Sequence, residues 1–252
     1  SFPEWLVERW LQRFGLDETV ELLEACNKTA PLVLRTCPAG REILAESLRG
    51  SGVAFQSGLY VPGALVLESG ANPARLPGYG EGLFYVQDEA AMLVGFLAAP
   101  GNDGLVLDLC AAPGGKATHL AELAGTGAAV MAAEPAPVRL AVLRRNIKRL
   151  RIDNVFGVAA DSLHPPFRPA DLVLCDVPCS GTGVLRRKPG LRWLIKAGDM
   201  ISLPVLQADI LKSAADCVRP GGVLVYSTCS LEPEENRAVV LGFLQNRTDF
   251  RL

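Results

Sequence analysis

From Leu83 onward, short apolar segments alternate with longer amphipathic ones, and this alternation constrains the fold more than any other feature of the chain. Five segments have the length and aliphatic content of buried strands, namely residues 105–109, 128–133, 155–159, 172–175 and 222–226. Helical periodicity is found between or before them, over residues 87–97, 117–124, 137–150 and about 203–218. Repeated strand–helix units predict an α/β domain over residues 83–252, with a mostly parallel sheet covered by helices on both faces.

The first 82 residues follow a different pattern, without regular strand–helix alternation. Three helical segments and two short strands are predicted there: helices over residues 2–14, 18–26 and 41–48, and strands over residues 31–35 and 63–67. Turn signals at Asn72-Pro73 and Pro77-Gly78 mark residues 69–82 as a linker. We therefore predict a small α+β subdomain over residues 1–82, followed by the α/β domain.

The composition is that of an ordinary globular protein, with 49% hydrophobic and 21% charged residues among 252. The formal net charge of −2 carries no global signal for nucleic acid, so any such contact must come from a local basic patch. The longest apolar stretch, residues 90–100, is far shorter than the ~20 residues of a membrane-spanning helix. No secretory signal leads the chain, so we expect a soluble, cytoplasmic protein. Because the chain starts with Ser and residues 249–252 resemble the start of a sixth strand, we expect it to be a piece of a longer protein.

Seven cysteines are spaced irregularly, at positions 26, 37, 110, 175, 179, 217 and 229. Their odd number, the lack of a C-x-x-C pair and the presence of only two histidines argue against a zinc site and a disulfide framework. We therefore expect no bound metal. Most of these cysteines should behave as small hydrophobic residues, among them Cys175, which lies inside an apolar strand.

A glycine turn links the first predicted strand of the α/β domain to the next helix, in the sequence LDLCAAPGGK at residues 107–116. Gly114 and Gly115 let the backbone approach a ligand closely, and free N–H groups at a helix start favour a carboxylate or phosphate. The spacing matches neither the P-loop nor the dinucleotide fingerprint. By itself the turn is equally compatible with a purely structural strand–helix connection.

Acidic residues follow three consecutive strands of the predicted sheet. Glu134 ends the second strand, about 20 residues after the glycine turn, at the position where a ribose hydroxyl pair is bound in such folds. Asp161 follows the third strand and Asp176 ends the fourth. Each alone could cap a helix or lie in a solvated loop. Together they predict a nucleoside pocket at the carboxyl edge of the sheet.

Two cysteines occupy polar loops at the ends of neighbouring strands. Cys179 lies in the segment DVPCSGTG that follows the fourth strand, and Cys229 lies in YSTCS after the fifth. The carboxyl ends of adjacent parallel strands face one cleft, so both thiols are predicted to lie beside the cofactor site. Polar, glycine-rich loops favour reactive thiolates more than an apolar core does. Cys110, directly before the glycine turn, is predicted to be a packing residue.

Three segments resemble the signature of the Sun/Fmu-type bacterial small-subunit rRNA cytosine-C5 methyltransferases. They are LDLCAAPGGK at 107–116, DVPCSGTGVLRRKP at 176–189 and YSTCSLEPEEN at 226–236. Residues 3–6, 31–35 and 85–90 also resemble that family, so the similarity covers nearly the whole chain. The combination of two cysteines is much more specific than the glycine turn. The resemblance implies a Rossmann-like methyltransferase domain, preceded by a small subdomain that serves as an RNA platform.

The resemblance also implies S-adenosylmethionine as the cofactor and a set of residues that bind it. The methionine part would be lined by the turn residues Cys110, Ala111, Ala112, Pro113, Gly114, Gly115 and Lys116. Glu134 would hold the ribose, with Arg139 nearby, and Asp161 would lie near the adenine. Asp176 belongs to this set and would also contact the cytosine ring. Glu134 stands where Asp is commoner in the family.

The resemblance assigns Cys229 as the nucleophile and Cys179 as the residue that assists product release. C5 of cytosine is a poor nucleophile, and attack of a thiolate on C6 converts the ring into an enamine-like species whose C5 can accept a methyl group. A hydrogen bond or proton from Asp176 to N3 would stabilise that addition, which requires a raised pKa of the Asp176 carboxyl. These three residues form the predicted catalytic set.

A basic run follows the Cys179 loop and is predicted to contact RNA phosphates through Arg186, Arg187, Lys188 and Arg192. Trp193 offers a stacking surface for a base, and the target base must leave its stack to react. A solvated basic loop without ligand is the competing interpretation. A second basic run over residues 144–151 is predicted to be solvated helix surface.

Two alternatives to a monomeric small-subunit rRNA methyltransferase stay open. One is the same reaction on tRNA, although the segment GVLRRKP at 183–189 resembles the small-subunit branch. The other is a non-catalytic assembly factor that binds S-adenosylmethionine and RNA. The presence of both Cys179 and Cys229 argues against that factor, because binding alone needs neither thiol.

Overall fold

The computed structural model describes residues 1–37, 40–68 and 71–252. The chain forms two compact units. The larger unit contains residues 31–176 and 213–225, and the smaller unit contains residues 1–30, 177–212 and 226–252. Among the described residues, no helix has the length and apolar character that crossing a membrane requires. The predicted boundary between residues 82 and 83 stays a prediction.

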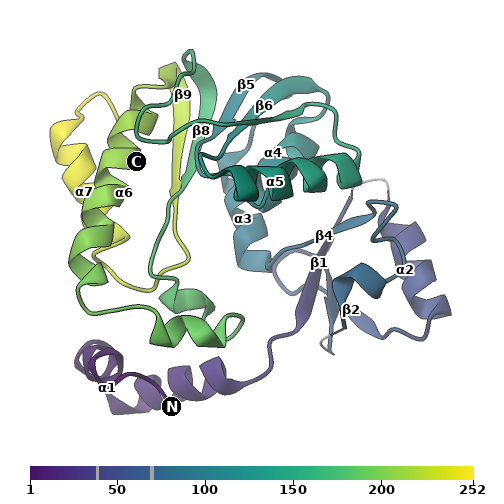
Figure 1. Cartoon of the computed structure of the whole chain (residues 1–252), viewed down its shortest axis with the longest axis horizontal. Helices are drawn as coiled ribbons and strands as arrows, with labels where there is room; N and C mark the ends of the chain where they lie inside the picture. The colour runs from purple at the N-terminus through teal and green to yellow at the C-terminus, as the bar shows by residue number, and fades with distance from the viewer. Residues whose placement is uncertain (38–39, 69–70) are drawn as a thin grey trace. The chain divides into compact units, whose positions relative to one another are not determined.

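The centre of the larger unit is a five-stranded sheet with the strand order β7-β6-β5-β8-β9. The strands are β5 (Asp103–Asp108), β6 (Gly127–Ala133), β7 (Val155–Val158), β8 (Ala170–Asp176) and β9 (Val218–Ser227), the last of which ends in the smaller unit. Val106 of β5 lies between Val130 of β6 and Leu172 of β8, and both pairings are parallel. The neighbouring strands can be followed in Figure 1. This arrangement confirms the predicted α/β fold.

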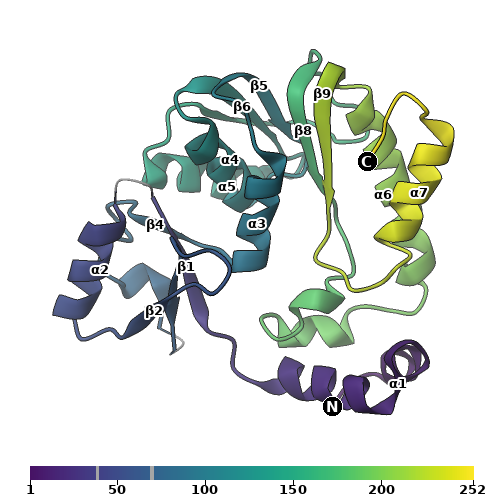
Figure 2. The ribbon, with the colours of Figure 1, turned by 180° about the vertical axis from the view of Figure 1, so that it is seen from behind.

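The larger unit also contains the helices α3 (Glu89–Ala98), α4 (Gly115–Ala124) and α5 (Pro137–Leu150). The bounds of α5 agree with the prediction, and those of α3 and α4 differ from it by one or two residues. α3 and α4 pack against each other and lie next to each other in the view from behind in Figure 2. The core between helices and strands is aliphatic, with Leu120, Val130 and Leu143 fully buried. Burial on both faces explains the continuous apolar runs of these strands.

A second, four-stranded antiparallel sheet belongs to the same unit and has the order β2-β3-β1-β4. Its elements are β1 (Leu32–Thr36), α2 (Arg41–Gly50), β2 (Phe55–Ser57), β3 (Leu65–Leu67), η1 (Pro73–Arg75) and β4 (Phe84–Val86). β1 and β3 lie within the strands predicted over residues 31–35 and 63–67, whereas β2 and β4 are not predicted, because neither has the continuous aliphatic run of β1 and β3. Within the predicted linker, Leu76 is buried in the core of this sheet together with Phe84, and residues 69–70 lie outside the described residues.

The smaller unit is built from helices and loops. It contains α1 (Glu4–Asn27), η2 (Thr182–Val184), η3 (Pro189–Trp193), most of α6 (Asp199–Ala215) and α7 (Arg237–Asn246). Gly15 interrupts α1 with a φ of 77°, which accounts for the two separate helical segments predicted from the sequence. Trp10 and Leu185 are fully buried in its core. The sequence does not predict α7, and residues 249–252 form a turn and irregular backbone where the start of a strand was expected.

Candidate active site

A pocket of about 220 Å³ opens in the larger unit at the carboxyl end of β5. It is lined by Tyr85, Val86, Gln87, Asp88, Ala91, Asp108, Cys110, Ala111, Ala112, Pro113, Gly115, Lys116 and Asp176. Six of the seven predicted turn residues therefore meet Asp176 around one cavity. The seventh, Gly114, adopts a φ of 111°, and a Cβ at this position would lie 2.8 Å from Leu143 of α5. Backbone conformation and close packing thus both require glycine there.

Lys116 and Asp176 form an ion pair across this pocket. The Lys116 Nζ lies 2.6 Å from the Asp176 Oδ2, and the two side chains are 17% and 31% exposed. The contact joins the first turn of α4 to the end of β8. Any hydrogen bond from Asp176 to a substrate base has to compete with this ion pair.

Asp108 also lines the pocket, although the sequence motifs did not single it out. It is buried, its Oδ1 accepts a hydrogen bond from the Cys110 N–H, and its Oδ2 has no partner in the protein. Burial, followed by the nearby charge of Asp176, raises the pKa of the Asp108 carboxyl to about 7. The signal in the sequence was a charged residue at the end of an apolar strand. Such a residue needs either a partner or a function.

Cys110 lies on the pocket wall but has the properties of a protonated thiol. Burial, and then the charge of Asp108, raises the pKa of Cys110 to about 12. Cys175, fully buried in β8, also has a raised pKa because of its burial. Neither cysteine is therefore suited to act as a nucleophile near neutral pH, in agreement with the packing role predicted for both.

Glu134 and Arg139 are brought together next to the glycine turn. Arg139 Nη2 lies 3.3 Å from the buried Glu134 carboxylate and donates a hydrogen bond of 3.0 Å to the Ala112 carbonyl. Glu134 Oε1 also accepts from the Ala136 N–H. Asp161 makes local contacts: its Oδ1 accepts from the Leu163 N–H at 3.0 Å, and its side chain is 53% exposed. The acids at the ends of β6 and β7 thus differ greatly in burial.

Cys179 and Cys229 meet in the smaller unit, with their Sγ atoms 3.1 Å apart. The Cys229 N–H also points at the Cys179 sulfur, at 3.3 Å. Cys229 is exposed and Cys179 is half-buried. The hydrogen bond with Cys229, followed by burial, raises the pKa of Cys179 well above its usual range. The two thiols are therefore placed to share a hydrogen bond, in which either sulfur can be the donor.

Backbone contacts hold the two cysteine loops against each other. The Gly183 N–H donates to the Cys229 carbonyl at 2.9 Å, and the Leu231 N–H donates to the Thr182 hydroxyl at 2.8 Å. Gly181 lies in the Cys179 loop with a φ of 70°, a conformation that residues with a side chain rarely adopt, and a Cβ there would lie 2.6 Å from the end of the Leu191 side chain. The glycines of the Cys179 loop are thus explained by geometry.

The basic run that follows the Cys179 loop divides into two kinds of residue. Arg192 is buried, donates to the Asn27 side chain at 2.9 Å and stacks on the ring of Phe2. Arg186 donates to the Thr29 carbonyl at 2.6 Å. The side chains of Arg187 and Lys188 are exposed, as is that of Trp193, which is 59% exposed. Arg186 and Arg192, two of the four predicted RNA-binding cations, therefore make hydrogen bonds to the end of α1 or the residues that follow it.

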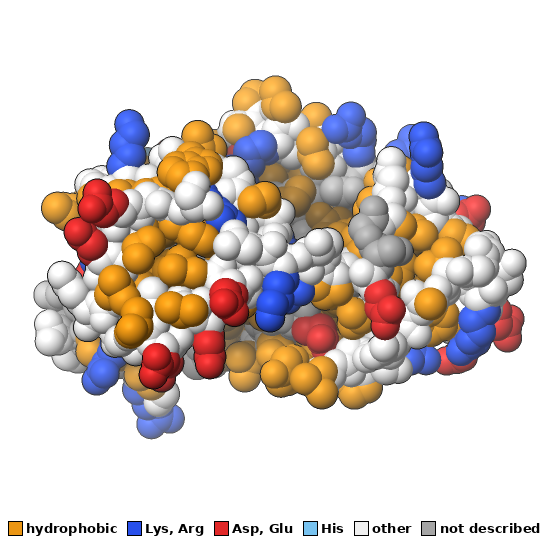
Figure 3. All heavy atoms as spheres, turned by 90° about the horizontal axis from the view of Figure 1, so that it is seen from below, with side chains coloured by type: hydrophobic (Ala, Val, Ile, Leu, Met, Phe, Trp, Pro, Cys, Tyr) orange, Lys and Arg blue, Asp and Glu red, His pale blue; other side chains and the backbone are white. Residues whose placement is uncertain are grey.

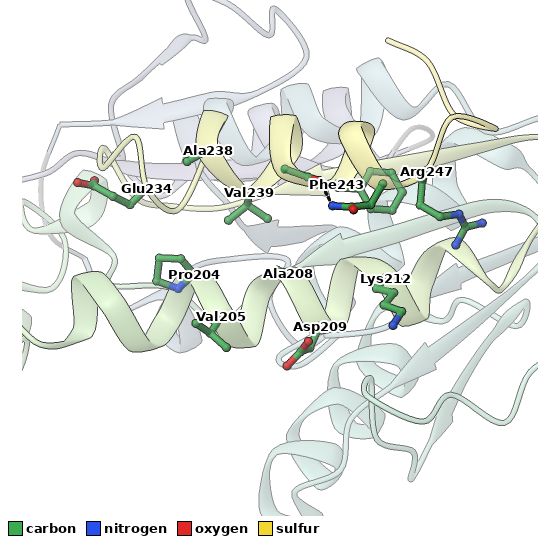
Figure 4. Close-up of a pocket in the computed structure, with 12 residues that line it drawn as sticks. Pro204, Val205, Ala208, Asp209, Lys212, Glu234, Ala238, Val239, Phe243 and Arg247 are labelled. Atoms are coloured by element: carbon green, nitrogen blue, oxygen red, sulfur yellow. Dashed lines mark hydrogen bonds between the residues drawn. The ribbon is translucent and has the colours of Figure 1, made fainter.

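A pocket of about 500 Å³ lies beside this run, lined by the end of α1 and by residues including Arg186, Arg192 and Trp193. A larger groove of about 740 Å³ lies between α6 and α7 and is lined by residues of both helices, among them Val205 and Phe243 (Figure 4). None of the predicted site residues lines that groove. Within the described part of the chain, no cluster of side chains has the composition of a metal site.

Comparison with known proteins relates most of the chain to one group. Residues 95–252 match the family described as 16S rRNA methyltransferase RsmB/F, and residues 2–73 match the ferredoxin-like domain of RsmF/B-like methyltransferases. Ribosomal RNA small subunit methyltransferase B of Sodalis glossinidius is 37% identical over 98% of this chain. A probable ribosomal RNA small subunit methyltransferase B of Synechocystis is 38% identical over 100% of it. The chain spans 58% of the length of both relatives.

Solved structures share the fold. A methyltransferase homolog protein from Pyrococcus horikoshii has a TM-score of 0.84 at 29% identity, covering 98% of this chain and 79% of that protein. NSun6 from Pyrococcus horikoshii, solved with SFG, has a TM-score of 0.89 at 22% identity and covers 97% of this chain and 88% of that protein. These similarities extend over both compact units.

Proposed function

Because this chain belongs to the 16S rRNA methyltransferase RsmB/F family, we propose that it transfers a methyl group from S-adenosylmethionine to C5 of a cytosine in small-subunit rRNA. The family membership agrees with the resemblance predicted from the three motifs. The observation that carries the proposal is the 3.1 Å contact between the Cys179 and Cys229 sulfurs. Binding a nucleoside or an RNA has no use for two thiols in contact, whereas covalent activation of cytosine requires one and gains from a second.

The residues around the glycine turn fit S-adenosylmethionine. The unpartnered Asp108 Oδ2 and the Lys116 ammonium offer polar contacts for its amino acid part, and the buried Glu134 offers a carboxylate for its ribose. The N–H groups at the start of α4 suit a carboxylate. When bound, the cofactor supplies an electrophilic methyl group. The proposed cofactor residues are those of the turn together with Glu134, Arg139, Asp161 and Asp176.

The two thiols have different roles in the proposed reaction. The Cys229 sulfur attacks C6 of the base, so that a C–S bond forms and C5 becomes nucleophilic. Asp176 supports the addition through a hydrogen bond to the ring. After C5 is methylated, it loses its proton to a base and the C–S bond breaks. The protonated Cys179 beside the departing sulfur assists this release, because a hydrogen bond stabilises the thiolate that leaves.

RNA contacts are proposed for the basic run of residues 186–192. Arg187 and Lys188 are exposed and suit phosphate contacts, and the exposed ring of Trp193 suits stacking with a base. Arg186 and Arg192 contribute by holding this segment against the end of α1. A monomeric cytoplasmic protein, with the subdomain of residues 1–82 as the RNA platform, completes the proposal.

Covalent trapping tests the proposed reaction. Fluorine at C5 blocks the loss of the C5 substituent, so wild-type protein with S-adenosylmethionine and 5-fluorocytosine RNA is expected to leave an adduct that survives denaturation. The adduct is expected to disappear in Cys229→Ala. Cys179→Ala should form an adduct even with ordinary cytosine RNA and release it slowly.

Two results would contradict the proposal. An adduct that persists in Cys229→Ala would assign the nucleophile to another residue. No adduct with folded, cofactor-bound wild type on small-subunit rRNA or tRNA would favour a non-catalytic binding factor. A third result, an adduct with tRNA but not with small-subunit rRNA, would support the proposed chemistry and identify tRNA as the substrate.

A further inference from the structure

A buried carboxylate lies behind the two cysteine loops and is not part of the reaction proposed above. Glu235 is fully buried, at 0% exposed, in the segment between Cys229 and α7. One of its oxygens accepts from the Ser180 N–H at 2.8 Å and from the Gln207 amide at 2.8 Å. The other accepts from the Ser230 hydroxyl at 2.5 Å and from the Ser180 hydroxyl.

The residues that Glu235 contacts are the immediate neighbours of the two thiols. Ser180 follows Cys179 and Ser230 follows Cys229 in the sequence. The two serine hydroxyls are also within 3.0 Å of each other. One carboxylate therefore holds the residue that follows each cysteine.

Glu235 is itself held in place from several sides. The Tyr226 hydroxyl donates to the Glu235 carbonyl at 2.6 Å, and Gln207 of α6 also donates to the Pro178 carbonyl at 3.0 Å, directly before Cys179. A buried side chain with a complete set of hydrogen bonds has little freedom to move. The network thus connects the Cys179 loop, the Cys229 loop and α6 through a single carboxylate.

We propose that Glu235 is the positioning residue that sets the distance between the Cys179 and Cys229 sulfurs. This proposal rests on the proposed function, because the separation of the two thiols matters only if both of them act on the same base. Glu235 itself touches neither sulfur, and it acts through Ser180 and Ser230. Its loss should therefore impair the step that needs both thiols more than the first attack by Cys229.

The chemistry of the four donors explains why this position holds a glutamate. A carboxylate accepts at both oxygens and can receive all four hydrogen bonds. In Glu235→Gln one oxygen becomes an NH₂ group, which would face donors from Ser180 and Gln207 or require the serines to reorient. An aspartate at this position is one methylene shorter and cannot keep both serines in reach.

Disulfide formation in the folded protein measures the separation of the thiols directly. Diamide accepts two hydrogens and becomes a hydrazine while two thiols form one disulfide, so no other reactant is needed. The Cys179–Cys229 disulfide is quantified by mass spectrometry of the cleaved protein at successive times. Alkylation of Cys229 by iodoacetamide, measured in the same variants, corrects for differences in the reactivity of that thiol alone.

Glu232→Gln is the matched control. Glu232 is equally buried and lies three residues before Glu235, but its side chain contacts Arg9 and Trp10 of α1 and neither Ser180 nor Ser230. Only its backbone N–H reaches the Ser230 hydroxyl, at 3.0 Å, and the substitution leaves that group in place. Both variants should lose thermal stability to a similar degree. Glu232→Gln is expected to form the disulfide at the wild-type rate, and Glu235→Gln at a rate about tenfold or more lower, because a buried hydrogen-bond network has been broken. Glu235→Asp provides a second variant if Glu235→Gln does not fold, and it is expected to be slowed as well.

Two results would overturn the proposal: equal rates in the Glu235 variants and Glu232→Gln, or no disulfide in the wild type. The assay contains neither RNA nor cofactor, so its result is independent of whether the proposed methyl transfer is correct. The same variants, tested in the 5-fluorocytosine experiment, then show whether the separation of the two thiols affects the proposed methyl transfer. Glu235→Gln is expected to retain the Cys229 adduct while product release from ordinary RNA slows.

Discussion

At the scale of single residues, the site depends on charges that the fold places where water does not reach. Asp108 lies buried at the end of β5 with one oxygen unpartnered, and burial raises its pKa to about 7. Glu134 and Glu235 are buried as well, but hydrogen bonds occupy their oxygens. A buried polar atom without a partner costs stability, so the unpartnered carboxyl oxygen of Asp108 in the pocket wall agrees with the contact to the cofactor that we propose for it.

The raised pKa of Asp108 predicts a specific pH dependence of stability. The folded protein holds the proton at pH values where the unfolded chain has already released it. This contribution is present at acid pH and disappears as the pH rises through about 7. Asp108→Asn is neutral throughout, so its Tm relative to wild type should rise by a few °C between pH 5 and pH 8, at ~2–4 °C per kcal/mol in a protein of this size. Thermal unfolding of both proteins at the two pH values is the measurement, and a constant difference would contradict the assignment.

At the scale of elements, β1 is joined to the glycine turn by one buried arginine. Arg35 of β1 forms an ion pair of 2.9 Å with Glu122 of α4, and both side chains are buried. It also donates to the Gly115 carbonyl and to the Thr118 hydroxyl in the first turn of α4. The small antiparallel sheet therefore supports the helix that begins at the cofactor pocket.

Removal of this arginine should destabilise the larger unit strongly. Arg35→Met leaves Glu122 buried without its cation, which typically costs ~3–5 kcal/mol. Arg41→Met removes an exposed ion pair with Glu42 and should change the free energy of unfolding by less than ~1 kcal/mol. Denaturant unfolding of both variants checks the difference. Similar destabilisation in the two would mean that Arg35 is not an anchor.

At the scale of the whole molecule, the charge is nearly balanced, with 25 basic and 27 acidic residues. Basic and acidic side chains are interspersed over the described residues of the face drawn in Figure 3. Long-range electrostatic attraction of this chain to RNA should therefore be weak, and the RNA binding that we propose depends on local contacts. Among the residues proposed to contact RNA, Arg187 and Lys188 are exposed cations that could make such local contacts with phosphates.

The salt dependence of RNA binding distinguishes exposed basic residues from the buried Arg192. Substitution of Arg187 and Lys188 by Ala should weaken RNA binding and reduce the slope of log K against log salt by about one for each phosphate interaction that the substitution removes. Arg192→Ala should instead lower the Tm, because its guanidinium is buried against Phe2 and Asn27. Binding isotherms at several salt concentrations, with thermal unfolding, measure both effects. An unchanged slope in the double variant would remove these two residues from the interface.

Local sequence carried enough information for the long elements and for the motifs. β5, β6 and β8 each contain a continuous apolar run, over residues 105–107, 128–133 and 172–175, and the apolar residues of α5 have helical spacing, so the local sequence is enough to recognise these elements. The three-residue strands β2 and β4 have no such period, because their place is set by pairing with β3 and β1. Arg192 and Lys188 look alike in the sequence, and only the packing around each separates the buried cation from the exposed one.

The sequence by itself determined the α/β fold, the glycine turn and the two loops that carry Cys179 and Cys229, because each depends on spacing within one segment. Only the tertiary structure decided the 3.1 Å contact of the two sulfurs, the burial of Asp108 and the role of Glu235. These properties arise between segments that lie far apart in the sequence. Distance, solvent exclusion and shared hydrogen bonds are physical quantities of the packed chain, and no local pattern encodes them.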